Sequence, residues 1–211
     1  VMASDILPTG LEVGVEEGKV SAGKTVAVVG AGPVGLAALV AARARSPSLL
    51  VAVDNNPHRL ETARRLGATH AIDNSDGKAA DRLMELTNGV GIDVAIEAIG
   101  LPVGWQVCED SVAAGGNIAI LGVHGKSVTL HLERMWKRNF TLTAGLVHTN
   151  TIPDILKQIK GGQLKPLNLI SHRFQLSDIL KAYDTFSNAS KHNALKVIIN
   201  NDLSKPTFSR V

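Results

Sequence analysis

Short apolar runs alternate with amphipathic stretches through most of this chain. The runs are rich in Val, Ile and Leu, which is typical of buried strands, and the stretches between them have the spacing of helices. Strands are predicted at residues 25–30, 48–54, 70–73, 92–97, 117–122 and 140–147. Helices are predicted at residues 33–45, 57–66, 77–87, 102–115 and 131–138. This alternation predicts an α/β fold with a doubly wound, six-stranded parallel sheet, the Rossmann arrangement.

The first predicted strand leads directly into a glycine-rich turn and a helix. In a Gly-x-Gly-x-x-Gly turn the first glycine permits the tight bend, the second lets the backbone approach a pyrophosphate, and the third lets the helix pack closely on the strand. The helix N-terminus offers unpaired N–H groups and a partial positive charge to phosphates. The residues expected to bind the phosphates are Gly30, Gly32, Pro33, Val34 and Gly35.

An acidic residue ends the second predicted strand. Asp54 lies about 20 residues after Gly35, where a carboxylate can accept hydrogen bonds from both hydroxyls of an adenosine ribose. The same carboxylate would repel a 2′-phosphate, and Asn55, Asn56 and Pro57 follow it in place of an arginine. Turn and acid together predict a site for NAD rather than NADP. A glycine turn in another kind of parallel α/β domain is the alternative interpretation.

The two ends of the chain have a different pattern, which predicts four segments. Residues 1–24 have no strong periodicity and form a lead-in segment, before a dinucleotide-binding domain at 25–147. Residues 148–201 form a C-terminal appendage with helices near 152–160 and 177–188 and strands near 169–174 and 194–200, and residues 202–211 form a loose tail. The first residue is Val1, and we expect the chain to be part of a longer protein.

Composition narrows the classes of function. The chain is 45% hydrophobic but only 3% aromatic, so its core is expected to consist of Val, Ile, Leu and Ala, as in a parallel sheet covered by helices. Its 22 basic and 19 acidic residues are scattered, which argues against a nucleic-acid or membrane-surface partner. No apolar run has membrane length, and the single Cys108 is expected to be buried, so we expect a cytoplasmic location.

Several of these segments together resemble the second half of the zinc-dependent medium-chain alcohol dehydrogenases. The matches cover nearly the whole chain in order: Val28–Gly35, Val53–Asp54, Leu66–Thr69, Gly91–Glu97, Ala114–Gly116, Gly122–Gly125 and Ser171–Phe174. The resemblance implies reversible oxidation of an alcohol to an aldehyde or ketone, with hydride transfer to NAD and with zinc as the Lewis acid. It also implies that the C-terminal appendage would complete a catalytic domain.

The resemblance further implies one metal ligand in this chain. Family members hold the catalytic zinc with three protein ligands, of which a Cys and a His lie in an N-terminal domain that this chain lacks. The third ligand lies just before a Thr-Gly pair, a position matched by Asp5 before Thr9 and Gly10. A solvated loop acid or a helix cap is the alternative role for Asp5. Because one carboxylate cannot hold zinc, we expect the chain alone to bind coenzyme but not to catalyse.

Other coenzyme contacts are expected at the carboxyl ends of the strands. The parallel topology brings Ala98, Gly100, Gly122 and His124 to the same crevice as the glycine turn. The resemblance assigns a basic residue near the adenosine ribose, a basic residue near the pyrophosphate, apolar residues along the coenzyme and two backbone positions that hold the carboxamide. These residues are Arg59, Lys196, Ile99, Val123, Gly145 and Val147, for which solvated surface or core roles are the alternatives.

Further expectations concern partners, histidines and alternative functions. The strand at 140–147 should lie at a sheet edge, where pairing with a second copy would give a homodimer or homotetramer. The substrate would be a small alcohol, aldehyde or ketone. The 7 histidines form no metal-binding motif and are expected in surface or capping roles. A freestanding dinucleotide-binding module and a zinc-free quinone reductase of the same superfamily are alternative functions.

Overall fold

The computed structural model describes residues 2–201, so the predicted tail at 202–211 lies outside the described residues. Contacts divide the chain into two units, Val1–Leu164 and Lys165–Val211. The boundary predicted from sequence lies earlier, after residue 147. The helix between the two positions belongs to the first unit, because its Ile155 is fully buried there.

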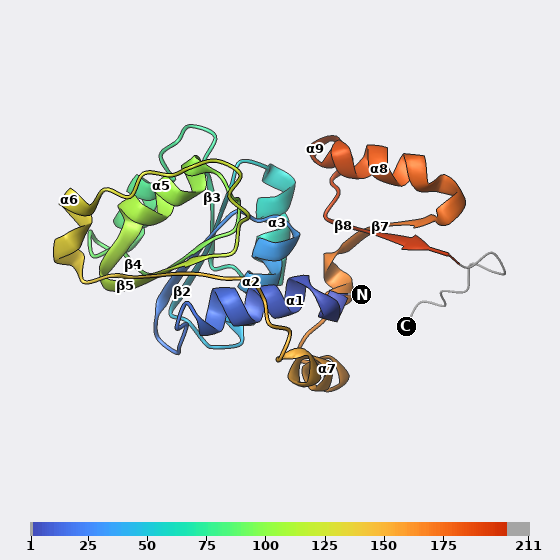
Figure 1. Cartoon of the computed structure of the whole chain (residues 1–211), viewed down its shortest axis with the longest axis horizontal. Helices are drawn as coiled ribbons and strands as arrows, with labels where there is room; N and C mark the ends of the chain where they lie inside the picture. Colours follow the sequence, from blue (N-terminus) through green and yellow to red (C-terminus); the bar gives the residue numbers. More distant parts are fainter. Residues whose placement is uncertain (1, 202–211) are drawn as a thin grey trace. The chain divides into compact units, whose positions relative to one another are not determined.

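The first unit is built on a six-stranded parallel sheet in the order β3-β2-β1-β4-β5-β6 (Figure 1). This order confirms the predicted doubly wound fold. The central strand β1 is covered on both faces, so Val26, Ala27, Val28 and Val29 are all fully buried. The strands are β1 (Thr25–Val29), β2 (Leu49–Asp54), β3 (His70–Asp73), β4 (Ile92–Glu97), β5 (Val112–Ile120) and β6 (Thr141–Ala144).

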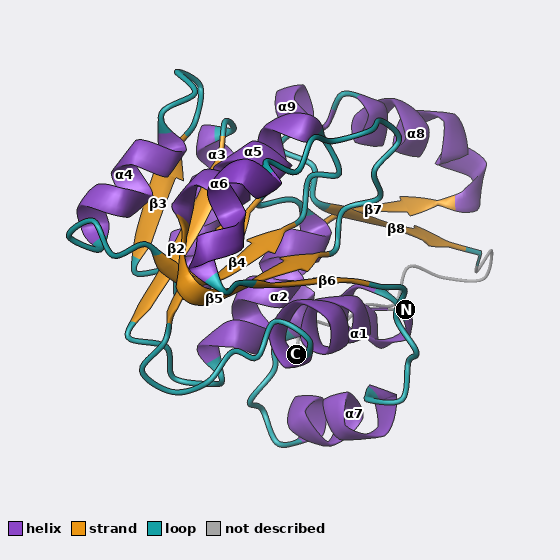
Figure 2. Ribbon diagram, turned by 60° about the vertical axis from the view of Figure 1, so that its left-hand side comes forward, coloured by secondary structure: helices purple, strands orange, loops and turns teal. Residues whose placement is uncertain are grey.

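Helices cover both faces of this sheet. Figure 2 shows α1 and α2 on one side and α5 and α6 on the other. Three of the helices begin with proline, whose fixed φ suits a first turn. Asn56 caps α3 by accepting hydrogen bonds from the N–H groups of His58 and Arg59. The helices of this unit are η1 (Met2–Ser4), α1 (Ile6–Thr9), η2 (Gly10–Glu16), α2 (Pro33–Arg43), α3 (Pro57–Leu66), α4 (Ala79–Leu86), α5 (Pro102–Ser111), α6 (Leu132–Met135), η3 (Trp136–Arg138) and α7 (Ile152–Lys160).

The lead-in segment is more ordered than its weak periodicity suggests. Residues 6–16 form one helical stretch, α1 followed by the π-helical η2, which packs against α2. Gly10 makes this packing close, because a Cβ built on it would lie 2.5 Å from the backbone nitrogen of Ala38. Gly14 likewise faces the side chain of Ala38. Glycines that resemble helix breakers in the sequence therefore serve as the contact surface between two helices.

Two predicted boundaries differ from the structure. α5 ends at Ser111, and residues 112–116 already belong to β5, whose pairing with β4 shifts between Val112 and Asn117. The alanine-rich sequence there favours a helix, but Gly115 has φ of +72° and sits in the irregular stretch. β6 covers Thr141–Ala144, which is shorter than the predicted strand, and it lies at the sheet edge as expected.

The second unit is a small parallel strand–helix–strand arrangement. β7 (Ile170–Gln175) and β8 (Lys196–Asn200) pair in parallel, and α8 (Ile179–Ser187) connects them. Its shorter helices are η4 (Pro166–Leu169), η5 (Leu176–Asp178) and α9 (Ala189–His192). The side chains of Leu180, Tyr183 and Phe186 on α8 are exposed.

Candidate functional site

A crevice opens at the carboxyl ends of β1, β2 and β4, where the strand order reverses around β1. In open α/β sheets this reversal is where ligands bind. The crevice has a volume of about 370 Å³, within the range of small-molecule sites. It is lined by Gly30, Gly32, Val53, Asp54, Asn55, Arg59, Asn74, Ala98, Ile99, Leu101 and Val103. Six of these, Gly30, Gly32, Asp54, Arg59, Ala98 and Ile99, are among the residues expected from the sequence.

The glycine turn leaves one wall of the crevice open to a ligand. Gly30 has φ of +103°, and a Cβ on it would lie 2.7 Å from the side chain of Ile99. A Cβ on Gly32 would meet a single neighbour, the guanidinium of Arg59 at 4.0 Å, so the backbone there is accessible. Gly32 is also the N-cap of α2 and has no side chain to cap it. The first turn of α2, whose N–H groups lack intrahelical partners, therefore begins at this wall of the crevice.

Asp54 is held in the crevice wall by backbone hydrogen bonds. One oxygen (Oδ2) accepts from the N–H of Ala31 at 2.8 Å, and the other (Oδ1) accepts from the N–H of Asn56 at 2.9 Å. The residue is only 7% exposed. A carboxylate can accept about four hydrogen bonds, so two positions remain for ligand hydroxyls. The carboxylate is therefore fixed in orientation before any ligand binds.

Arg59 lies beside Asp54. Its guanidinium Nη1 is 3.7 Å from Oδ2 of Asp54, and its side chain is partly exposed. The sequence places no basic residue directly after Asp54, but the first turn of α3 brings Arg59 back to it. The crevice thus contains one negative and one positive group, and both face the space beside Gly32.

The other predicted coenzyme contacts lie in three places. Gly100, Gly122 and Val123 meet at the ends of β4 and β5, where a Cβ on Gly100 would lie 2.5 Å from the carbonyl oxygen of Val123. Gly145 and Val147 follow the end of β6 at the sheet edge. Lys196 begins β8 in the second unit.

Asp5 is exposed and precedes α1. Its backbone carbonyl accepts hydrogen bonds from the N–H and the hydroxyl of Thr9, and its Oδ1 is 3.4 Å from that hydroxyl. Within residues 2–201 no group of three or more His, Cys, Asp or Glu side chains lies close enough to hold a metal ion. The described residues therefore do not by themselves fit a zinc ion at Asp5.

Two buried acids pair with histidines for which the sequence predicts surface or capping roles. Glu97 is fully buried and accepts hydrogen bonds from the N–H groups of Ile99 and Gly100, both at 2.9 Å. His124 Nε2 lies 3.1 Å from Glu97, and His131 Nδ1 lies 2.7 Å from the buried Glu109. The only sequence signal for Glu97 is an acidic residue at the end of an apolar strand. Glu97 fixes the turn that forms one side of the crevice.

A third buried acid, Glu12, joins the lead-in segment to the chain after β6. Its carboxylate accepts hydrogen bonds from the N–H groups of His148 and Thr149 and from both the N–H and the hydroxyl of Thr151. Burial alone would raise the pKa of Glu12, but the hydrogen bonds from Thr151, His148 and Thr149 outweigh burial, and the pKa is below the ordinary 4.5. No local motif indicates this contact, because the partners lie 136 or more residues away.

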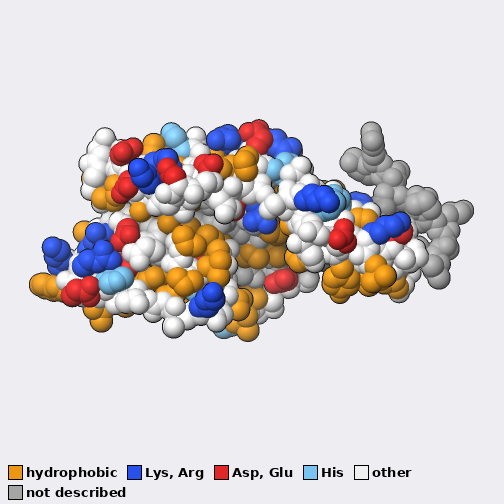
Figure 3. All heavy atoms as spheres, turned by 90° about the horizontal axis from the view of Figure 1, so that it is seen from above, with side chains coloured by type: hydrophobic (Ala, Val, Ile, Leu, Met, Phe, Trp, Pro, Cys, Tyr) orange, Lys and Arg blue, Asp and Glu red, His pale blue; other side chains and the backbone are white. Residues whose placement is uncertain are grey.

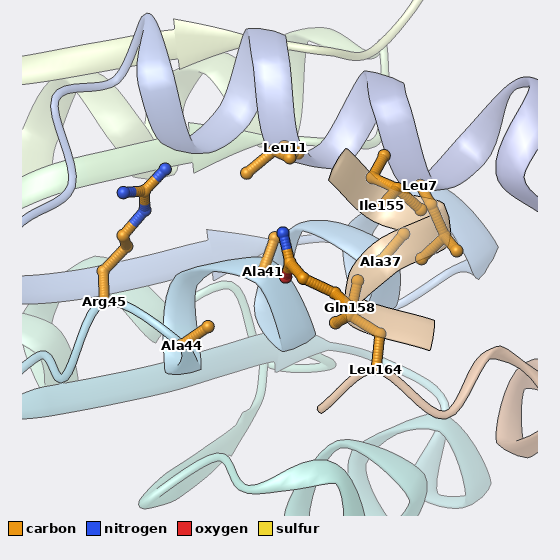
Figure 4. A pocket seen from close by; sticks show the side chains of 9 residues that line it. All are labelled: Leu7, Leu11, Ala37, Ala41, Ala44, Arg45, Ile155, Gln158 and Leu164. Atoms are coloured by element: carbon orange, nitrogen blue, oxygen red, sulfur yellow. The ribbon is translucent and has the colours of Figure 1, made fainter. Parts of the chain in front are cut away.

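A separate cavity of about 190 Å³ lies between α1, η2, α2 and α7 (Figure 4). Its lining is largely aliphatic, with Leu7, Leu11 and Ile155 pointing into it, and Arg45 and Gln158 supply the polar groups. Arg45 is 3.5 Å from Glu16 and so already has an acidic partner. We interpret this cavity as a packing gap between helices, because it holds no arrangement of groups suited to the chemistry of the crevice.

On the face shown in Figure 3, basic and acidic side chains are interspersed. In the part of the chain that the structure describes, no helix combines the length and apolar character needed to cross a bilayer.

Comparisons with known proteins agree with the fold. The zinc-binding dehydrogenase family matches residues 33–161. An alcohol dehydrogenase from Cupriavidus necator is 32% identical over 210 residues, which cover 94% of this chain and 55% of that protein. The solved zinc-dependent alcohol dehydrogenase 2 from Streptococcus pneumonia, in its apo form, is 49% identical with a TM-score of 0.91, over 95% of this chain and 58% of the other.

A third relative was solved with a coenzyme. It is a putative zinc-binding dehydrogenase from Sinorhizobium meliloti 1021 bound to NADP, 25% identical with a TM-score of 0.84, over 92% of this chain and 57% of the other. The chain thus spans little more than half the length of these three relatives. Because the family match covers more than half of the chain, this chain belongs to the zinc-binding dehydrogenases, the zinc-type medium-chain alcohol dehydrogenase family, and corresponds to the half that contains the Rossmann fold.

Proposed function

We propose that this chain is the NAD(H)-binding part of a zinc-dependent alcohol dehydrogenase that transfers a hydride between a small alcohol and NAD. On its own the chain binds the coenzyme and does not catalyse the reaction. The observation that carries this proposal is the open crevice beside Gly32, with Asp54 already fixed in its wall by two backbone N–H groups. These features fit a dinucleotide, because they offer one anion-binding turn and one acceptor for ribose hydroxyls.

Each part of the crevice has a distinct role in this proposal. The accessible backbone at Gly32 and the first turn of α2 receive the pyrophosphate, and Asp54 accepts hydrogen bonds from the adenosine ribose. Arg59 lies close enough to Asp54 to balance its charge and to approach a phosphate. The bound nicotinamide supplies the carbon that accepts or releases the hydride. Further contacts from Ala98, Ile99, Gly100, Gly122, Val123, Gly145, Val147 and Lys196 stay predictions.

The choice between NAD and NADP depends on Asp54. One relative was solved with NADP, so family membership alone does not select the coenzyme. The Asp54 carboxylate would repel a 2′-phosphate, whereas Arg59 would attract one. Two backbone donors fix the Asp54 carboxylate, and the Arg59 guanidinium lies 3.7 Å from it. We therefore expect repulsion of a 2′-phosphate by Asp54 to outweigh its attraction by Arg59. Fluorescence titration of the chain with NADH and NADPH tests this: NADH should bind more tightly, and tighter NADPH binding would overturn the preference for NAD.

Zinc belongs to the proposed parent protein rather than to this chain. Asp5 supplies one carboxylate, and the described residues contain no group of three metal-ligating side chains.

The exposed apolar side chains of α8 favour the parent enzyme over a freestanding module, because a self-sufficient module would be expected to cover them. The quinone reductase alternative has no supporting observation. A cytoplasmic location stays a prediction from the sequence.

Assembly through the sheet edge is part of this proposal. β6 is the edge strand, and its exposed residues include Leu142, which is 41% exposed. Unpaired backbone groups and an apolar side chain on an edge favour pairing with a second copy. We expect light scattering to give a dimer or tetramer at micromolar concentration and Leu142→Lys to shift it toward monomer. A monomer for the unmutated chain would contradict this expectation.

A further inference from the structure

Glu12 has an unusually complete set of hydrogen bonds for a side chain outside the crevice. Four donors converge on its carboxylate: the N–H groups of His148 (2.8 Å), Thr149 (3.0 Å) and Thr151 (2.9 Å), and the Thr151 hydroxyl (2.7 Å). The residue is 8% exposed, and its pKa is lowered by these bonds against the opposing effect of burial. A charged, fully accepting carboxylate therefore holds a loop of otherwise exposed backbone.

The residue lies in a helix of uncommon geometry. Gly10–Glu16 forms a π-helix, in which the N–H of Glu17 donates to the carbonyl of Glu12. π-helical turns are rare and occur frequently at functional sites. The same segment begins two turns earlier at Asp5, and Gly10 locks it against α2. The helix that carries Glu12 is thus held in place by its packing against α2.

The loop that Glu12 holds lies at one end of the coenzyme path. In the strand order β2-β1-β4-β5-β6, the crevice with Asp54 lies at β2 and the phosphate-binding turn follows β1. A dinucleotide whose adenosine is on the β2 side must direct its other half across the carboxyl ends of β4, β5 and β6. At about 4.8 Å between neighbouring strands, β6 lies about 14 Å from β1. Residues 145–151 follow the carboxyl end of β6.

We propose that Glu12 is a positioning residue for the nicotinamide half of the coenzyme: it holds residues 148–151 and thereby fixes the backbone that leaves β6. The inference rests on the proposed coenzyme function. It differs from a general stabilising role, because the effect of Glu12 should fall on one half of the dinucleotide only. Asp93 is the control residue. Its carboxylate also accepts hydrogen bonds from a backbone N–H and a hydroxyl, both of Thr25, but this contact lies at the opposite, amino end of β1.

The test compares a coenzyme with a fragment that lacks nicotinamide. Affinities of the full chain for NADH and for ADP-ribose are measured by titration for the parent, Glu12→Gln and Asp93→Asn. The amide introduced by Glu12→Gln keeps the size of the side chain but presents N–H groups toward backbone donors. We expect Glu12→Gln to weaken NADH binding about tenfold, equivalent to about 1.4 kcal/mol, with ADP-ribose binding changed less than about twofold. Asp93→Asn should leave the ratio of the two affinities unchanged.

Two further measurements keep the inference testable if Glu12→Gln folds poorly. Thr151→Val removes only the hydroxyl donor and should shift the NADH to ADP-ribose ratio in the same direction by a smaller factor. Hydrogen exchange at the amides of His148, Thr149 and Thr151 should accelerate in both variants without any coenzyme present. Equal weakening of NADH and ADP-ribose, or no change in either, would overturn the role of Glu12 while leaving coenzyme binding intact. A parent chain that binds neither compound would instead refute the proposed function.

Discussion

Replacing Asp54 gives the sharpest test of the coenzyme recognition proposed for the crevice. In Asp54→Gly the ribose loses an acceptor for both hydroxyls, and each hydrogen bond to a charged group is worth about 1.5–3 kcal/mol. The N–H groups of Ala31 and Asn56 lose their partner but can turn to water in the opened crevice. We take the net loss as about 3 kcal/mol, which corresponds to roughly 150-fold weaker NADH binding.

The affinity for NADPH should not fall in the same variant. A carboxylate and a phosphate charge about 5 Å apart repel by about 3 kcal/mol at an effective dielectric constant of about 20. Asp54→Gly removes this repulsion and frees Arg59, whose guanidinium is 3.7 Å from Asp54 in the parent, to face the 2′-phosphate. NADPH affinity should therefore stay constant or increase, and the preference for NADH should disappear.

The assay is a fluorescence titration with both coenzymes, alongside two control variants. Asp54→Asn keeps the size of the side chain and removes its charge, so its effect on NADPH should resemble that of Asp54→Gly. Asp93→Asn alters a partly buried carboxylate at the opposite, amino ends of β1 and β4 and should change neither affinity. NADH affinity within about twofold of the parent in Asp54→Gly, or an equal change for both coenzymes, would remove Asp54 from the site.

Two other predictions concern stability. The pKa of Glu12 is lower in the folded chain than the ordinary 4.5, so its contribution is fully present above that pH and is lost as the pH falls through the folded pKa. Glu12→Gln should therefore lower the Tm at pH 7, and the difference from the parent should shrink as the pH falls below 4.5; a constant difference would contradict the linkage. Gly10→Val should cost about 1–3 kcal/mol, or several degrees in Tm, because its side chain would overlap the backbone of Ala38. Gly125→Ala, with no atom within 4 Å of the added Cβ, is the control, and an equal Tm for the two variants would contradict the close packing of η2 on α2.

Local signals made most of the sheet and helices predictable. Apolar β-branched runs mark β1, β2 and β4, and Asn56 and Gly67 mark the start and end of α3. These signals are local because each cap or turn is satisfied by residues within a few positions. The strand order follows from them, since right-handed crossovers leave few alternatives.

The missed features depend on distant partners. Gly10 looks like a helix breaker until Ala38 is seen against it, and Glu12 looks like a solvated acid until residues 148–151 reach it. The pairing of Glu97 with His124 likewise joins the ends of two neighbouring strands. The sequence predicted that the glycine turn and Asp54 lie at one crevice, but the positions of Asn74 and Val103 in its lining come only from the fold.

The single thiol has a practical consequence for experiments on this protein. Cys108 is fully enclosed between α5 and the sheet, and burial followed by the nearby charge of Glu97 raises its pKa well above the usual range. A protonated, enclosed sulfur is inert toward alkylating reagents, so labelling can proceed only through molecules whose interior has opened. The rate at which a maleimide reacts with the unmutated chain therefore reports how often the interior of the Rossmann fold opens. Any ligand that binds the native form should lower this labelling rate in proportion to its occupancy.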